Sequence, residues 1–293
     1  MRHAGERAVQ SRAGFGGHEL GSATVGAQIP PIAAEFLRRQ PMVVLGAADD
    51  DGAVWATMLT GQAGFVTALD ERTVAVADQP RPGHPLGGLF DRERAVGLLA
   101  IEPGTRRRMR INGQAQATGT GLVVRTDQVY ANCPKYIQTR EPSPAPGAPG
   151  EVRVTSALTG PQRALIGAAD TFFVATYAAG LGADASHRGG NPGFVQVTGP
   201  DRLTWPEYVG NRMFMTLGNL ELDPRCGLLF PDWESGDLLH VTGRAVVSED
   251  PERVAAVPGA QRLVDLDVDR VVSVARGSGL RWTFGGYFRL NPR

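Results

Sequence analysis

The sequence contains the same pattern twice, at a nearly constant spacing of 130 residues. Gly97–Leu99 recurs as Gly227–Leu229, and Ile111–Ala115 is similar to Val241–Ala245. Three more pairs keep this spacing to within one residue: Met42–Val44 with Phe172–Val174, Gly64–Val66 with Gly193–Val195, and Arg72 with Arg202. A single tripeptide match can arise by chance, whereas a constant spacing over a long stretch indicates a tandem duplication.

The repeated segments have the composition of β-strands. They are short, rich in Val, Leu, Phe and Thr, and bounded by turn residues. Asp49–Gly52 is predicted to form a hairpin turn between strands at Met42–Ala47 and Val54–Leu59. About six closely spaced strands per copy, with few helices between them, favour a small barrel or sandwich. The expected fold is therefore mainly β with a few short helices.

Three helices are expected between and before the repeated strands. They are Ile32–Arg39, Gln128–Arg140 with Asp127 as its N-cap, and Thr159–Ala169, which leads into the second copy. The predicted division of the chain is an N-terminal arm over residues 1–28, a diverged first half with its following helix over 29–140, a linker over 141–160, and a second half over 161–293. The linker is expected because Pro, Gly, Ser and Ala dominate its first ten residues.

Composition excludes several classes of protein. The 293 residues carry a formal net charge of zero, without the basic excess of a nucleic-acid binder. Cys133 and Cys226 make neither a disulfide framework nor a metal-ligand cluster, so no metal is expected. The chain has no apolar run of membrane-spanning length and no signal-peptide core. We therefore expect a cytoplasmic protein that binds neither nucleic acid nor membranes.

Asn211 and Arg212 form the first candidate site. They follow a predicted strand and the turn residues Pro206 and Gly210, and they precede a helical stretch at Met213–Leu220. An arginine beside the backbone donors of a helix N-terminus suits a phosphate group. The alternative is an ordinary surface arginine.

Ser186, His187 and Arg188 form the second candidate. They lie on the preceding strand, and the glycines Gly189 and Gly190 that follow would let a flat ligand approach the backbone closely. The alternative is a hairpin loop with incidental polar residues. The five histidines of the chain form no metal-type pair with its cysteines or acids.

Arg106, Arg108 and Arg110 share one face of a predicted strand. Usually such a run is a solvated face. Three like charges on one face would otherwise require an anion or carboxylates nearby.

Lys135 is the only lysine in the chain. Nucleotide bias in the genome explains most of the preference for arginine, but an ammonium and a guanidinium differ in shape and hydration. On the predicted helix, Asn132, Lys135 and Tyr136 would share a face. Cys133 has no adjacent His or Asp that would make it a nucleophile, so a structural role is favoured for it.

The second copy resembles the pyridoxamine 5′-phosphate oxidase-like FMN-binding split-barrel family. The resemblance rests on Glu207–Arg212, Leu222–Pro231 and Leu239–Ala245. It implies two split barrels forming a pseudo-dimer, the first of them diverged, because Pro80–Pro82 stands where the Gly-Asn-Arg motif is expected. The N-terminal arm and Asn132–Gln138 resemble a bacterial subgroup of fused split-barrel proteins.

The resemblance also implies a cofactor, FMN, and its binding residues. It assigns Asn211 and Arg212 to the phosphate and, more loosely, Ser186, His187 and Arg188 to the strand edge along the isoalloxazine.

In dimeric relatives the opposite subunit completes each site, and here the first half would do so. The candidates for this role are Lys135, Tyr136 and Gln138, and Trp282 resembles a late aromatic residue that approaches the flavin.

The expected function is an FMN-dependent oxidoreductase acting on an unidentified small molecule. The family's lysine after the Arg is Met213 here, and residues 281–287 lack the pattern that holds pyridoxine phosphate, so another substrate is expected. NADPH or NADH as electron donor, and the oligomeric state, stay open. The alternatives are a non-catalytic flavin-binding protein and a haem or deazaflavin binder on the same fold.

Overall fold

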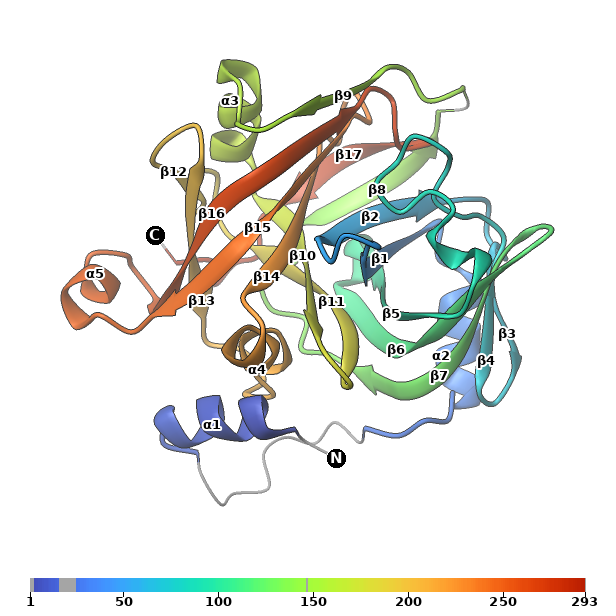
Figure 1. Cartoon of the computed structure of the whole chain (residues 1–293), viewed down its shortest axis with the longest axis horizontal. Coiled ribbons are helices and arrows are strands. Elements are labelled where there is room, and N and C mark those ends of the chain that lie inside the picture. The colour runs from blue at the N-terminus through green and yellow to red at the C-terminus, as the bar shows by residue number, and fades with distance from the viewer. Residues whose placement is uncertain (1–2, 16–24, 146, 293) are drawn as a thin grey trace.

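Two antiparallel sheets form the body of the molecule (Figure 1). The computed structural model describes residues 3–15, 25–145 and 147–292. The first sheet contains β1 (Met42–Ala48), β2 (Val54–Thr60), β3 (Val66–Asp70), β4 (Thr73–Val76), β5 (Arg94–Glu102), β6 (Arg107–Thr118) and β7 (Gly121–Ala131). The second contains β10 (Thr171–Ala178), β11 (Gly182–Gly189), β12 (Gln196–Val197), β13 (Arg202–Tyr208), β14 (Arg225–Pro231), β15 (Leu238–Ser248) and β16 (Ala260–Val274), with β9 (Val152–Thr155) paired to β16.

The two sheets have the same topology, which confirms two tandem split barrels. The first follows the order β2-β1-β5-β6-β7-β4-β3, and the second follows β11-β10-β14-β15-β16-β13-β12. Each strand of the second order is the repeat of the strand at the same place in the first. Even a local irregularity is repeated, since the register shifts between Asn112 and Gly113 in one copy and between Thr242 and Gly243 in the other. The common path holds seven strands per copy rather than the six expected.

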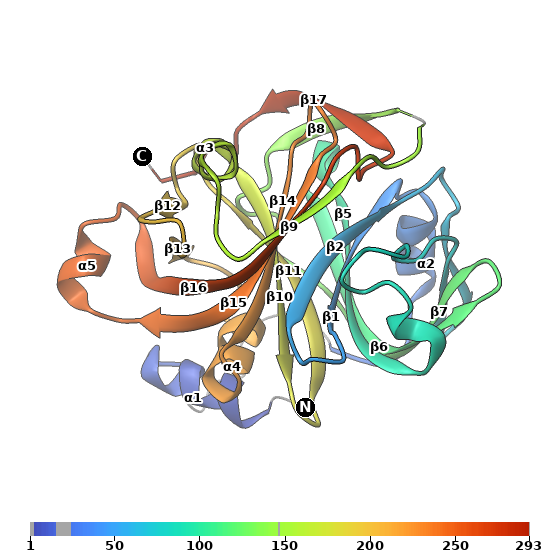
Figure 2. The ribbon, with the colours of Figure 1, turned by 45° about the horizontal axis from the view of Figure 1, so that its top comes forward.

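The barrels meet along a seam (Figure 2), and reciprocal contacts, β5 with β11 and β2 with β14, relate them by a pseudo-two-fold axis. A Cβ on Gly97 would lie 2.6 Å from the Cα of Asp184, and a Cβ on Gly227 would lie 2.7 Å from the Cα of Trp55. Gly97 and Gly227 are repeat equivalents, and each packs on the same stretch of the other barrel. This reciprocity is the signature of an isologous interface, here within one chain.

The strands at the seam are apolar on both faces. β1 and β10 are buried along nearly their whole length, because one face fills its own barrel and the other packs across the seam. The core of the first barrel accordingly includes Phe173 and Leu229 from the second. Burial of such continuous apolar surface is the main force joining the halves.

The helices cover the ends of the barrels. They are α1 (Ala4–Arg12), α2 (Pro31–Arg38), α3 (Gly160–Ala168), α4 (Met215–Leu222) and α5 (Pro251–Ala255), with 3₁₀ turns at Leu89–Asp91 and Pro103–Thr105. α2 and α3 agree with the predicted helices within one residue at each end. In the described ranges, none of these helices has the length and apolar character needed to cross a membrane.

The predicted helix over Gln128–Arg140 is wrong. β7 continues through Ala131 because its residues complete the ladder with β6, so Asp127 is no N-cap. The chain then turns at Tyr136, whose φ is +65°, and enters β8 (Thr139–Pro144). β8 pairs with β17 (Leu280–Gly286) near the C-terminus. The predicted linker is therefore partly strand, since β8 and β9 are both paired.

Candidate functional site

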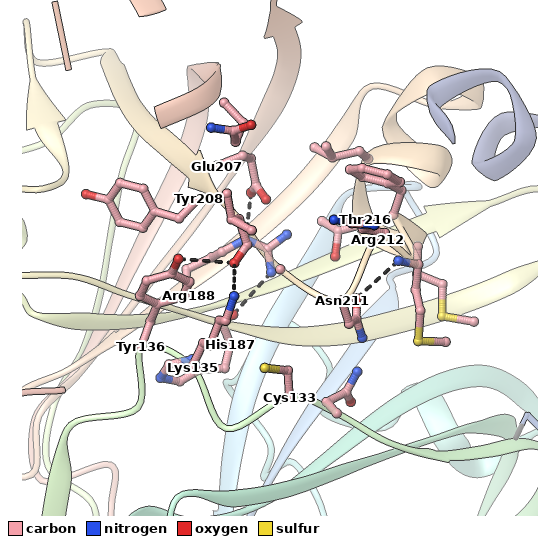
Figure 3. Close-up of a pocket in the computed structure, with 18 of the residues that line it drawn as sticks. Cys133, Lys135, Tyr136, His187, Arg188, Glu207, Tyr208, Asn211, Arg212 and Thr216 are labelled. Atoms are coloured by element: carbon pink, nitrogen blue, oxygen red, sulfur yellow. Dashed lines mark hydrogen bonds and ion pairs between the residues drawn. The ribbon is translucent and has the colours of Figure 1, made fainter. Parts of the chain in front are cut away.

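A pocket opens at the seam between the two barrels (Figure 3). Its walls come from β6 and the segment after β7 in the first barrel, from β11, β13 and the start of α4 in the second, and from the end of α1. The cavity holds about 280 Å³, near the lower end of the range for small-molecule sites. Neither barrel alone encloses this space.

The turn from Asn211 to Phe214 forms one end of the pocket. Arg212 and Phe214 have φ values of +62° and +58°, a left-handed conformation that is costly for residues other than glycine. The Asn211 side chain supports the turn by accepting a hydrogen bond from the backbone N–H of Met213 at 3.1 Å. Pro206, expected in a turn, lies within β13 opposite Leu263.

The Arg212 guanidinium lines this end of the pocket over the ring of Phe15, 4.2 Å from its centroid. Within the described residues, no carboxylate forms an ion pair with it. The helix α4 begins just beyond, and no side chain caps its first turn, because Phe214 stands at the N-cap. An unpaired cation therefore lies beside backbone N–H groups that lack a side-chain acceptor.

β11 is the edge strand of the second sheet and contributes His187 and Arg188 to the pocket wall. The Nε of Arg188 donates to Glu207 at 2.6 Å, so its charge is neutralised. Ser186 is fully buried and accepts hydrogen bonds from Arg110 and Arg188 instead of facing the pocket.

His187 is joined to the first barrel by Arg108, whose Nη1 donates to its Nδ1 at 2.8 Å. Burial, and then the positive charge of Arg108, hold the pKa of His187 well below its usual value of 6.5. The ring is therefore neutral, with its proton on Nε2. Burial and the nearby Arg110 and Arg188 lower the pKa of Arg108 to about 9, which still leaves it charged at neutral pH.

Arg110 forms a buried ion pair across the seam with Asp184, at 2.9 Å. Asp184 also accepts from the hydroxyl of Tyr130 at 3.1 Å and from that of Thr216 at 3.4 Å. Arg108 and Arg110 thus share a face as the alternation predicts, whereas Arg106 precedes the strand with a φ of +55°. Of these arginines, only Arg110 has the neighbouring carboxylate that the sequence predicts, that of Asp184, in the part of the chain that the structure describes.

Three buried polar atoms of residues that line the pocket lack a hydrogen-bond partner among the described residues. They are two donors, the Nε atoms of Arg108 and Arg110, and one acceptor, the side-chain oxygen of Asn132. An unsatisfied buried polar group is costly, and such groups often mark the position of a ligand or an ordered water.

The segment that follows β7, which contains Lys135 and Tyr136, also lines the pocket. Nζ of Lys135 donates to the carbonyl oxygen of Val209 at 3.4 Å, and the hydroxyl of Tyr136 donates to the same oxygen at 3.1 Å. The ring of Tyr136 packs against Tyr208, with 5.1 Å between centroids. The predicted nearness of Lys135 and Tyr136 to the second barrel is thus observed, although they lie in a loop and not on a helix (Figure 3).

Besides Ser186, two further predicted site residues lie elsewhere. Gln138 is buried and joins backbone segments, donating to the carbonyl oxygen of Gly190 and accepting from the N–H of Phe288. Trp282 packs edge-on against Trp233, 5.6 Å between centroids, and does not line the seam pocket.

The positions related to Arg110 and His187 on the other side of the seam are occupied by side chains that contact one another and a further histidine. Adding 130 to Arg110 gives His240, and subtracting 130 from His187 gives Thr57. Nε2 of His240 lies 3.2 Å from the Thr57 hydroxyl and 3.2 Å from Nε2 of His84. Leu86, two residues after His84, is fully buried. Histidines and apolar side chains thus replace the arginines found at the open pocket.

Residues 158–275 match the family model described as Pyridoxamine 5′-phosphate oxidase. The resemblance predicted from the second copy is confirmed, because the matched residues make up most of the second barrel. No curated protein matches the chain.

Several solved structures are similar to part of the chain. A putative pyridoxamine 5′-phosphate oxidase from Lactobacillus delbrueckii is 23% identical over 40% of this chain and 94% of its own, with a TM-score of 0.33. HupZ from Group A Streptococcus is 16% identical over 39% and 91%, with a TM-score of 0.32. An FMN-binding protein from Syntrophomonas wolfei is 12% identical over 38% and 82%, with a TM-score of 0.31.

Proposed function

We propose that the chain binds one FMN in the seam pocket and acts as a flavin-dependent oxidoreductase on a small molecule. The observation that carries this proposal is the unpaired Arg212 beside the uncapped first turn of α4. A phosphate group would neutralise the guanidinium and accept hydrogen bonds from N–H groups in the first turn of α4, which no side chain caps. The family match of the second barrel supports the same assignment.

The unpartnered atoms of the wall fit the flavin ring. The pyrimidine edge of a flavin presents an N–H donor between two carbonyl acceptors. The side chains of Arg108 and Asn132 line the pocket with these atoms covered, and they would turn toward that edge on binding, Arg108 donating to a carbonyl and Asn132 accepting from the N–H. Both atoms come from the first barrel, so residues 29–140 and 161–293 would form one functional unit.

When bound, the flavin would supply the electron-transfer chemistry, and the protein would supply binding, orientation and electrostatics. Arg108 would hold a positive charge against the ring. His187 would remain neutral, with a proton kept at Nε2 because Nδ1 accepts from Arg108. Lys135 and Tyr136 would limit access of water from the mouth by bridging to Val209.

The absorbance spectrum of the purified protein tests the proposed cofactor, because flavin, deazaflavin and haem absorb differently. We expect a flavin spectrum that is bleached by anaerobic NADPH or NADH and recovers with an electron acceptor. Binding of FMN without any reduction or turnover would instead establish a flavin-binding protein that is not an enzyme. A haem or deazaflavin spectrum would contradict the proposal.

A further inference from the structure

The N-terminal helix α1 packs on α4, at the end of the pocket that Arg212 forms (Figure 1, Figure 2). A Cβ on Gly5 would lie 2.0 Å from the carbonyl oxygen of Gly218, so only glycine allows the two helices to approach this closely. Val9 and Gln10 are buried in the contact. α1 therefore packs as part of the second barrel, although it precedes the first barrel in the sequence.

Gln10 ties α1 to the strained turn of the pocket. Its Nε2 donates to the carbonyl oxygen of Arg212 at 3.1 Å and lies 3.4 Å from that of Met213. These carbonyls belong to the segment in which Arg212 and Phe214 are left-handed. Such a conformation persists only where surrounding contacts determine it, and Gln10 supplies two of them.

The end of α1 places an aromatic ring beneath Arg212. Gly14 has a φ of +77°, and the N–H of Phe15 donates to the carbonyl oxygen of Gln10 at 2.9 Å, as in a Schellman motif. This turn sends Phe15 back toward the pocket, where its ring lies 4.2 Å from the Arg212 guanidinium. A cation over an aromatic face is attracted to it and gives up part of its freedom of rotation.

We propose that Gln10 and Phe15 are positioning residues for phosphate recognition by Arg212. Gln10 fixes the backbone of the turn, and Phe15 holds the guanidinium along the pocket wall before the ligand arrives. The cost of ordering a long arginine side chain is then met on folding instead of on binding. This inference rests on the proposed function, since it concerns the phosphate end of the FMN site.

The test compares FMN with riboflavin, which lacks the phosphate, by titration of the full chain and quenching of flavin fluorescence. The variants are Gln10→Ala, Phe15→Leu and, as a control on the same helix, Arg12→Ala, which removes exposed pairs with Glu221 and Glu249. We expect FMN affinity to fall by about threefold to tenfold in Gln10→Ala and Phe15→Leu. Riboflavin affinity should be unchanged in both, and Arg12→Ala should bind both flavins like the parent protein.

A double variant makes the test specific to positioning. In an Arg212→Ala background, Phe15→Leu should weaken FMN no further, because the group that Phe15 positions is absent. Equal weakening of FMN and riboflavin, additive losses in the double variant, or no effect of either substitution would overturn the inference. If the parent protein prefers FMN through Arg212 while Gln10→Ala and Phe15→Leu bind normally, only the role of α1 fails. If the parent protein binds neither flavin, the proposed function fails as well.

Discussion

Arg108 in the first barrel donates a hydrogen bond to Nδ1 of His187 in the second, across 2.8 Å of the seam. Two residues along the same strand, Arg110 is neutralised by Asp184. Within the described residues Arg108 has no carboxylate partner, and both it and His187 line the pocket. At the pocket, the seam therefore combines an ion pair that joins the barrels with a cation that has no carboxylate partner in the described ranges.

Replacing Arg108 with Met should lower the midpoint potential of the bound flavin. A positive charge against the ring stabilises the reduced, anionic form, and its loss should cost about 30 mV or more, or ~1.4 kcal/mol for a two-electron couple. Arg107→Met is the matched control, because Arg107 is adjacent on β6 but exposed on the opposite face. Lys135→Ala should lower the potential less, since solvent screens the mouth. Reductive titration measures all three, and an unchanged potential in Arg108→Met would exclude this role.

Replacing Arg212 with Ala should weaken FMN by about tenfold to hundredfold, since a charge-assisted contact contributes roughly 1.5–3 kcal/mol. Riboflavin should bind the variant as it binds the parent protein. Arg202→Ala, on the exposed side of β13, serves as the control. If Arg212→Ala weakens both flavins equally, Arg212 does not contact the phosphate.

Replacing Asp184 with Ala should destabilise the fold by about 3–5 kcal/mol, because Arg110 would keep a buried charge without a partner. Glu35→Ala, which breaks the exposed pair with Arg38, should cost no more than about 0.5 kcal/mol. Urea unfolding gives both values. A loss below about 1 kcal/mol in Asp184→Ala would show that the seam does not depend on this pair.

The filled side of the seam contains a chain of neutral histidines. The N–H of Leu86 donates to Nδ1 of His84 at 3.0 Å, and Nδ1 of His240 lies 3.2 Å from the carbonyl oxygen of Val272. His84 must then carry its proton on Nε2 and His240 on Nδ1, so that His84 donates to Nε2 of His240. Burial lowers the pKa of His84 to about 2 and that of His240 to about 4.

Acid should therefore destabilise the protein through this chain. Both histidines are neutral when folded and take up a proton near pH 6.5 when unfolded, so their contribution is complete above that pH and is lost progressively below it, down to about pH 4 for His240. Each contributes a slope of at most about 1.4 kcal/mol per pH unit. His84→Gln should show a shallower loss of unfolding free energy between pH 7 and pH 5 than the parent protein. An equal or steeper slope would mean that His84 is already protonated in the fold.

Local pattern and repetition predicted much of the fold. The β1–β2 hairpin, α2, α3 and the duplicated barrels follow from short-range signals and from the spacing of 130 residues. The helix over Gln128–Arg140 failed because strand pairing with β6 and β17 outweighs local propensity there. Lys135 lies near the second barrel, as expected, but in a loop and not on the predicted helix.

The site was harder to predict, because its contacts join distant segments. Gln10, Phe15 and Asp184 meet Arg212 or Arg110 only after the chain folds, and no sequence motif marks them. Gln138, in contrast, was predicted to line the site and does not. It lies next to pocket residues in the sequence, yet its amide is fully used in joining backbone segments.

The number of FMN molecules released per chain tests the central claim most directly. We expect one, because Arg212 faces an open pocket on one side of the seam while His84, His240 and Leu86 fill the related position on the other. The parent protein, saturated with FMN and freed of excess ligand, should release one equivalent on denaturation. Two equivalents would show that the filled side still binds cofactor, and none would contradict the assignment of the seam pocket to FMN.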